Sequence, residues 1–202
     1  MNKPLRKLRT TIEDLRRREL IAAAHRVFMQ HGLGGLTTQR ICAEAGLSAG
    51  ILTYYFKGKD EVLLAMVRLN NRILSQDVAA RLRAAQTPWA RLEAIVAGNF
   101  PETVFTPTVA AAWLSLCAES GVRPPFRRLQ QIFYARLRSN ISAALGPGVP
   151  EALTMTIAAM IDGFWLRRAS DARLTSSLVV GVILQAVAAQ LTPEDRARMA
   201  GG

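Results

Sequence analysis

The chain has 202 residues, half of them hydrophobic, which suits one large domain or two smaller ones that share a core. No apolar run approaches the roughly 18 residues of a membrane span, and the basic start lacks the apolar segment of a signal peptide. The formal net charge of +11 favours a polyanionic partner, so we expect a cytoplasmic protein that binds nucleic acid and not membranes.

The first helix is expected over residues 13–30, where apolar side chains recur at spacings of three and four and Gly32 follows as a stop.

The first 60 residues carry 11 Lys and Arg against 5 Asp and Glu, so positive charge is densest there. A DNA-binding segment explains this density, and a solvated arm is the alternative. Cys42 and Cys117 lack C-x-x-C spacing and are expected as small core residues in a reducing compartment.

Two short helices separated by a glycine turn are expected next, up to residue 45 and over 49–56. The residues expected to cap them or to form the turn are Thr37 or Thr38, Gly46 and Ser48. Braced by the first helix, this pair predicts a helix-turn-helix. The residues expected in its small core are Ile41, Ala45, Leu47, Ile51 and Leu52.

The other side of the second short helix is expected to meet the major groove of DNA. Thr53 and Tyr54 are the expected base readers, while Tyr55 and Lys59 are expected to hold phosphates. Gly50 costs roughly 1 kcal/mol inside a helix relative to alanine, and close approach of a base or phosphate would explain it. The predicted DNA-binding residues are Thr38, Gln39, Ser48, Ala49, Gly50, Thr53, Tyr54, Tyr55 and Lys59.

A core role is the alternative for the three consecutive rings of this stretch. For Phe56 the core role is favoured over DNA contact. For Tyr55 the two roles are equally supported, and for Tyr54 the core role is less favoured.

The rest of the chain also has a helical period, beginning with a long helix over 60–85. Prolines break the later helices, which are expected near residues 87–99, 109–120, 126–145, 151–168 and 174–191. Such breaks can hold helices apart around a cavity, and aromatic side chains are available for its wall. The predicted ligand-binding residues are Phe100, Phe105, Trp113, Tyr134, Asp162 and Trp165.

A quaternary ammonium ion suits such a cavity, because aromatic faces bind a cation that has no N–H to donate. Asp162 lies in an otherwise apolar helix and is the preferred carboxylate, with Glu102 and Glu119 as weaker candidates. The alternatives are that Asp162 pairs with Arg167 or with a neighbouring helix, and that Trp113 and Trp165 have ordinary core roles.

The last two apolar helices, over 151–169 and 174–191, are richer in apolar residues than a surface helix needs. Pairing them with their copies predicts a homodimer with a four-helix interface, and a buried terminal helix is the alternative.

No catalytic or metal site is expected, because His25 and His31 are six residues apart and no phosphate loop or nucleophile elbow appears. A basic membrane-surface helix is disfavoured because acidic residues interrupt the N-terminal charge.

Residues 36–63 resemble the DNA-binding signature of TetR-family repressors, T-x-x-I-A-x-x-A-G-V-S-x-G-x-L-Y-x-H-F-x-x-K-x-x-L. The matching residues are Thr38, Ile41, Ala45, Gly46, Ser48, Gly50, Leu52, Phe56 and Lys59. The departures are Cys42 for alanine, Thr53 for tyrosine and Tyr55 for histidine. The resemblance implies an all-α protein with a three-helix DNA-binding domain over 1–60 and a ligand-binding and dimerisation domain over 61–202.

Segments 98–100, 111–120, 128–141 and 158–169 resemble the choline-responsive repressors of glycine betaine synthesis. The resemblance implies a homodimer on a palindromic operator, no cofactor, and choline or a related quaternary ammonium as effector. A TetR-type repressor for another hydrophobic or cationic molecule is the alternative. Ligand binding either moves the long helix over 60–85 and releases the operator, or leaves the operator bound and changes polymerase access.

Overall fold

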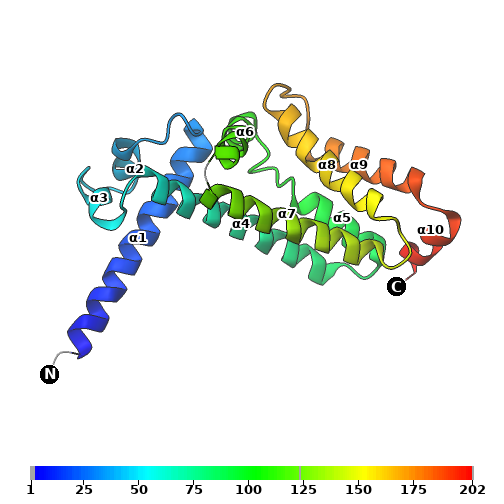
Figure 1. Cartoon of the computed structure of the whole chain (residues 1–202), viewed down its shortest axis with the longest axis horizontal. Helices are drawn as coiled ribbons and strands as arrows, with labels where there is room; N and C mark the ends of the chain where they lie inside the picture. Colours follow the sequence, from blue (N-terminus) through cyan, green and yellow to red (C-terminus); the bar gives the residue numbers. More distant parts are fainter. Residues whose placement is uncertain (1–2, 123, 202) are drawn as a thin grey trace. The chain divides into compact units, whose positions relative to one another are not determined.

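The protein is helical throughout the residues that the computed structural model describes, which are 3–122 and 124–201, with side chains for 12–118, 121 and 124–201. The helices are α1 (Lys3–His31), α2 (Thr38–Glu44), α3 (Ile51–Tyr55), α4 (Lys59–Ala84), α5 (Pro88–Gly98), α6 (Pro107–Val122), α7 (Pro124–Leu145), α8 (Glu151–Arg168), α9 (Ser176–Gln190) and α10 (Pro193–Ala200) (Figure 1). Within these residues no strand occurs, and no helix has both the length and the apolar character to cross a bilayer.

The chain divides into two compact units, Met1–Asn70 and Asn71–Gly202. The division falls inside α4 rather than at the 60/61 boundary expected from the sequence. The first turns of α4 belong with the N-terminal unit because Arg17 binds Glu61 and the His25 ring lies 3.3 Å from the Asn70 side-chain oxygen.

The N-terminal unit packs α1, α2 and α3 against one another. Its buried side chains come from all three helices and from the start of α4: Leu20, Ala23, Ala24, Val27, Phe28, Leu36, Ile41, Cys42, Leu52, Phe56, Val62, Leu63, Met66 and Val67. The first helix begins at Lys3, ten residues before the expected start at Glu13, and Leu15 of the expected apolar stripe is 53% exposed. The stop at Gly32 is confirmed by its φ of 66°.

The C-terminal unit is a bundle in which α7 packs against α5, α6 and α8, and α9 packs against α5 and α8 (Figure 1). Gly98 of α5 lies directly against Val78 of α4, since an added Cβ would lie 2.5 Å from Val78 Cγ2 and 3.0 Å from Val78 Cα. A side chain at this position would therefore push the two helices apart.

The last helix, α10, was not expected. Thr192 caps it by accepting a hydrogen bond from Asp195 N–H at 3.1 Å, with Pro193 in the first turn. The segment "TPED" carries the usual signals of a helix start, so local chemistry was sufficient to predict it.

Candidate functional site

The turn between α2 and α3 is fixed by backbone hydrogen bonds and one left-handed residue. Gly46 has a φ of 67°, and its N–H donates to the Ala43 carbonyl at 3.0 Å. The Leu47 N–H donates to the Cys42 carbonyl at 2.9 Å. The buried Cys42 thiol lies 3.7 Å from the Ala49 carbonyl, to which it donates. These contacts seat the residues before α3 on α2, as a helix-turn-helix requires.

The exposed side of α3 and the turn before it carries most of the predicted DNA-binding residues. The exposed members are Gln39, Ser48, Ala49, Gly50, Thr53, Tyr54 and Lys59, while Thr38 and Tyr55 are half-buried. Tyr54 is 64% exposed and meets the Tyr55 ring edge to face at 4.9 Å. The Thr53 hydroxyl donates to the Gly50 carbonyl at 2.8 Å, which fixes its orientation. The face is polar and open, as groove contact needs.

Several local expectations for α3 were wrong. The helix spans only Ile51–Tyr55, and Gly50 is its N-cap, so Ser48 does not cap it and Gly50 does not lie inside it. Glycine is tolerated at an N-cap, so the expected helix penalty does not apply. A Cβ at Gly50 would have no protein atom within 4 Å, and its φ is −71°, so neither packing nor backbone conformation demands glycine there.

The small core of the helix-turn-helix also differs from expectation. Ile41 and Leu52 are buried, but the three other expected residues, Ala45, Leu47 and Ile51, are only half-buried. Cys42 and Phe56 fill the core with them because both side chains point inward and are at most 2% exposed. The core role favoured for Phe56 is confirmed by this burial.

The sequence did not indicate Arg17, which contacts the end of α3 and the start of α4. Its partners are 38 and 44 residues away in the sequence. Helical periodicity reports only neighbours along one helix, so no short-range pattern indicates so distant a contact.

In the C-terminal unit, three of the predicted ligand-binding residues form a closed aromatic core. Phe100, Phe105 and Trp165 are each at most 8% exposed. The Trp165 ring lies 5.0 Å from that of Phe105 and 6.3 Å from that of Phe100. Its indole N–H donates to the Asn99 carbonyl at 3.1 Å, and the Arg168 guanidinium lies 5.3 Å from the Phe105 ring. A protein cation therefore already lies within cation-π distance of this cluster.

The other three form a second cluster with contributions from α6, α7 and α8, which pack on one another. The Tyr134 hydroxyl interacts with the Asp162 carboxyl and lowers its pKa, and the Tyr134 ring lies 5.9 Å from that of Phe133. Phe133 in turn lies 6.0 Å from Trp113, edge to face. Phe133 was not predicted, although a ring next to Tyr134 on α7 was available in the sequence.

Two polar residues that the sequence did not indicate as ligand-binding complete this second cluster. Gln130 donates from its side-chain nitrogen to Tyr134 Oη and Cys117 Sγ, both at 3.4 Å. Cys117 lies one helical turn after Trp113 on α6, so the two share a face. Because three of its members are predicted ligand-binding residues, we use the name effector cluster for Trp113, Cys117, Gln130, Phe133, Tyr134 and Asp162.

Burial dominates the electrostatics of the effector cluster. It raises the pKa of Asp162 from 3.8 to about 6, against the opposing effect of the hydrogen bond from Tyr134. Burial and then the Asp162 charge raise the pKa of Cys117 to about 11 and that of Tyr134 to about 12. No basic group contributes to the pKa of Asp162 among the described residues, so the expected alternative of an Arg167 ion pair is not seen there. A carboxylate lacking a cation is suited to receive one.

The weaker carboxylate candidates lie apart from these contacts. Glu102 is exposed in the segment between α5 and α6. Glu119 lies outside the residues whose side chains the structure describes.

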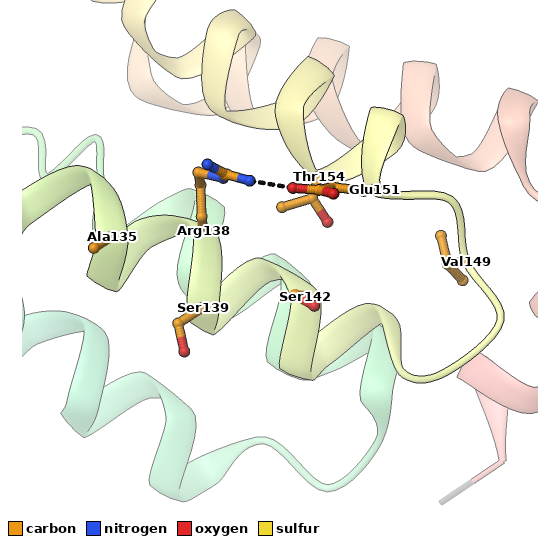
Figure 2. A pocket seen from close by; sticks show the side chains of 7 residues that line it. All are labelled: Ala135, Arg138, Ser139, Ser142, Val149, Glu151 and Thr154. Carbon is orange, nitrogen blue, oxygen red and sulfur yellow. Dashed lines mark hydrogen bonds and ion pairs between the residues drawn. The ribbon is translucent and has the colours of Figure 1, made fainter.

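A cavity of about 430 Å³ lies between α7 and the start of α8. Figure 2 shows Arg138 on α7 reaching Glu151 at the start of α8, with which it forms an ion pair. Ser139 and Ser142 on α7 and Thr154 on α8 also line the cavity. Ala135 and Val149 complete the lining, and none of the predicted ligand-binding residues belongs to it. The cavity is polar, and its cation is already paired.

Comparison with known proteins supports the architecture at both ends of the chain. Residues 20–66 match the family described as bacterial regulatory proteins of the tetR family. Residues 88–192 match the family described as BetI-type transcriptional repressor, C-terminal. The chain belongs to the TetR family.

Individual relatives agree with this TetR-family membership. The HTH-type transcriptional regulator BetI of Brucella melitensis biotype 2 is 40% identical over 165 residues, which cover 80% of this chain and 83% of that protein. A transcriptional regulator from Rhodococcus sp. Rha1 has the same fold, with a TM-score of 0.72, 22% identity and coverage of 88% and 99%. A regulator from Saccharomonospora viridis, solved in complex with choline, has a TM-score of 0.68 and 23% identity, covering 87% and 95%.

The family assignment establishes several of the expectations. The protein is a TetR-family transcriptional repressor with a BetI-type C-terminal domain, and its relatives are named as regulators rather than enzymes. Its all-α fold with a helix-turn-helix head is confirmed. Regulators of this family bind DNA operators and small-molecule effectors, typically as dimers.

Proposed function

We propose that this TetR-family regulator represses genes of choline and glycine betaine metabolism in the cytoplasm, and that a quaternary ammonium such as choline is its effector. The effector cluster carries this proposal, since its half-buried carboxylate has no basic group acting on it among the described residues and interacts with Tyr134. The Tyr134 ring continues through Phe133 to Trp113. The BetI-type match and the choline complex of the Saccharomonospora viridis regulator point the same way.

Trp113, Tyr134 and Asp162 are the proposed effector contacts, and Phe133 joins them. A trimethylammonium group carries its charge on methyl surfaces, so ring faces can bind it where a conventional hydrogen bond cannot form. The carboxylate then supplies the opposite charge. Phe100, Phe105 and Trp165 are better assigned to the core because they are already packed on one another and on Arg168.

The proposed assembly is a homodimer formed through α8 and α9. Apolar side chains on these two helices remain exposed in the single chain: Met155 at 57%, Leu166 at 53%, Leu178 at 49% and Val182 at 39%. Leu178 and Val182 are four residues apart, so they share one face of α9. A two-fold pairing of these faces would bury them and present two α3 helices to half-sites about 34 Å apart on a palindrome.

In this proposal Thr53 and Tyr54 read bases, while Thr38, Gln39, Ser48, Tyr55 and Lys59 hold the backbone, with Ala49 and Gly50 at the closest approach. Effector binding favours a state in which α4 has moved and the two heads no longer match the groove spacing. Operator release requires that the effector prefer that state, typically by about 1 to 3 kcal/mol.

Isothermal calorimetry with the intact protein tests the effector. Choline and betaine aldehyde are expected to bind with one site per protomer, and glycine betaine more weakly because its carboxylate meets Asp162. The uncharged choline isostere 3,3-dimethylbutan-1-ol is the matched control, and its affinity should be at least tenfold lower because the charge contribution is lost. Equal affinity for the isostere, or binding of none of the ammonium compounds, would instead support a TetR-type repressor for another effector.

Lys59→Ala tests the proposed phosphate contact. The exposed ammonium lies on the first residue of α4, so its loss should weaken binding to all duplex sequences alike. The slope of log affinity against log salt should become shallower by about one unit. Arg128→Ala, which removes an exposed cation on α7, is the control and should leave the slope unchanged. A loss confined to one preferred sequence would contradict the phosphate assignment.

A further inference from the structure

The guanidinium of Arg17 joins three parts of the DNA-binding head. Nη1 donates to the carbonyl of Tyr55, and Nη2 donates to Glu61 Oε1 at 2.8 Å. The group also lies over the Phe56 ring, 4.3 Å from its centroid. One side chain of α1 thus contacts the last residue of α3, the buried ring that follows it, and the first turn of α4.

Glu61 extends this contact to the loop that leaves α3. Its second oxygen accepts a hydrogen bond from the Lys57 N–H at 2.8 Å. The hydrogen bond from Arg17 and then that from Lys57 lower the pKa of Glu61, so the carboxylate stays charged. Arg17 and Glu61 together therefore hold both the end of α3 and the start of the connection to α4.

The helix α3 depends on such outside support. It has five residues and no side-chain hydrogen bond at its N-cap. Isolated helices this short are unstable, and the last carbonyls of a helix have no partner within it. A cation at the C-terminal end satisfies such a carbonyl and interacts favourably with the helix dipole. Arg17 provides this cation to Tyr55.

We propose that Arg17 is a positioning residue for DNA recognition, which holds α3 in the one orientation that presents Thr53 and Tyr54 to the groove. This inference rests on the proposed reading role of α3. Arg17 acts through Tyr55, Phe56 and Glu61 rather than through DNA, because two nitrogens and the face of its guanidinium are already engaged within the head.

The first experiment measures hydrogen exchange on the free, intact protein and is independent of DNA. Arg17→Gln should make the amides of residues 51–56 exchange at least tenfold faster while those of α2 change little. Arg16→Gln is the matched control, because Arg16 is the neighbouring cation and its ion pair among the described side chains is with Glu19, within α1. Equal protection of residues 51–56 in the two variants would overturn the proposal.

The second experiment measures binding to an operator duplex selected from a random library with the wild-type protein, and to a scrambled duplex. Arg17→Gln should lower operator affinity about 10- to 100-fold and leave scrambled-duplex affinity within twofold. Arg17→Lys should give an intermediate operator loss. Its ammonium keeps the attraction to Glu61, but it cannot hydrogen-bond the Tyr55 carbonyl at the same time. Glu61→Gln should add little to Arg17→Gln in the double variant, since the two residues act as one unit.

Two outcomes of the binding experiment would overturn the positioning role. Equal losses on both duplexes, with a salt slope shallower by about one unit, would make Arg17 a phosphate contact. Operator affinity equal to that of Arg16→Gln would remove any role in recognition. If the wild type selects no operator, the proposed function fails, while the exchange result still decides whether Arg17 orders α3.

Discussion

Asp162→Asn is expected to weaken choline binding by about 2 kcal/mol, roughly thirtyfold, at pH 8. Losing one partner of a buried charge pair costs about 2 to 5 kcal/mol, and the lower value fits because Asp162 is only half-buried. Asparagine keeps the shape and can still accept the hydrogen bond from Tyr134. Calorimetry at pH 8 measures the charge contribution with little change in packing.

The same variant is expected to stabilise the free protein at pH 8. The pKa of Asp162 is raised from 3.8 to about 6, so between these values the folded state binds more protons than the unfolded state. The free energy of unfolding of the wild type therefore falls as pH rises through this range, and Asp162→Asn removes that dependence. Urea titrations of both proteins between pH 4 and pH 8 measure the difference.

Choline affinity of the wild type should rise with pH, whereas its free energy of unfolding should fall. At pH 5 only about a tenth of Asp162 is ionised if its pKa is about 6, so the apparent affinity should be about tenfold lower than at pH 8. Glu102→Gln is the matched control, because this carboxylate is exposed and its loss should leave binding and its pH dependence unchanged. If Asp162→Asn binds choline as the wild type does, the carboxylate is not the counterion.

In the head, sequence patterns predicted the elements better than their detailed contacts. Gly46 and the helical period of α1 are local signals. They correctly predicted the tight turn and the first helix of the helix-turn-helix. The role of Arg17 depends on residues 38 and 44 positions away, which no local pattern encodes. The start of α3 was misplaced because Ser48 is a good cap by type, yet here its carbonyl, not its hydroxyl, bonds Ile51 N–H.

In the C-terminal unit, composition identified the aromatic residues but not how they group. Six candidate side chains were expected around one cavity, and tertiary packing separates them into a closed core at Trp165 and a half-buried cluster at Asp162. Which rings meet depends on the crossing of α6, α7 and α8, which helical periodicity leaves undetermined. Asp162 was identifiable because a carboxylate in an apolar helix needs an explanation.

Trp165→Ala is expected to lower the free energy of unfolding by about 3 to 5 kcal/mol, the usual range for removing a buried tryptophan. The ring packs on Phe100 and Phe105 and is 8% exposed, so its loss leaves a cavity in the core. Trp165→Phe keeps an aromatic ring but leaves the Asn99 carbonyl without its indole donor, and should cost about 1 to 2 kcal/mol. Urea unfolding at one fixed protein concentration measures both, because the stability of the proposed dimer would depend on concentration.

Trp113→Phe is the matched control for Trp165→Phe, and the two should show opposite patterns. Trp113 is half-buried in the effector cluster, so its change should affect stability little and reduce choline affinity, since tryptophan is the best ring for a cation. Trp165→Phe should reduce stability and leave choline affinity within about threefold. The reverse pattern would place the cation among Phe100, Phe105 and Trp165, and Arg168 would then have to leave the Phe105 ring to admit it.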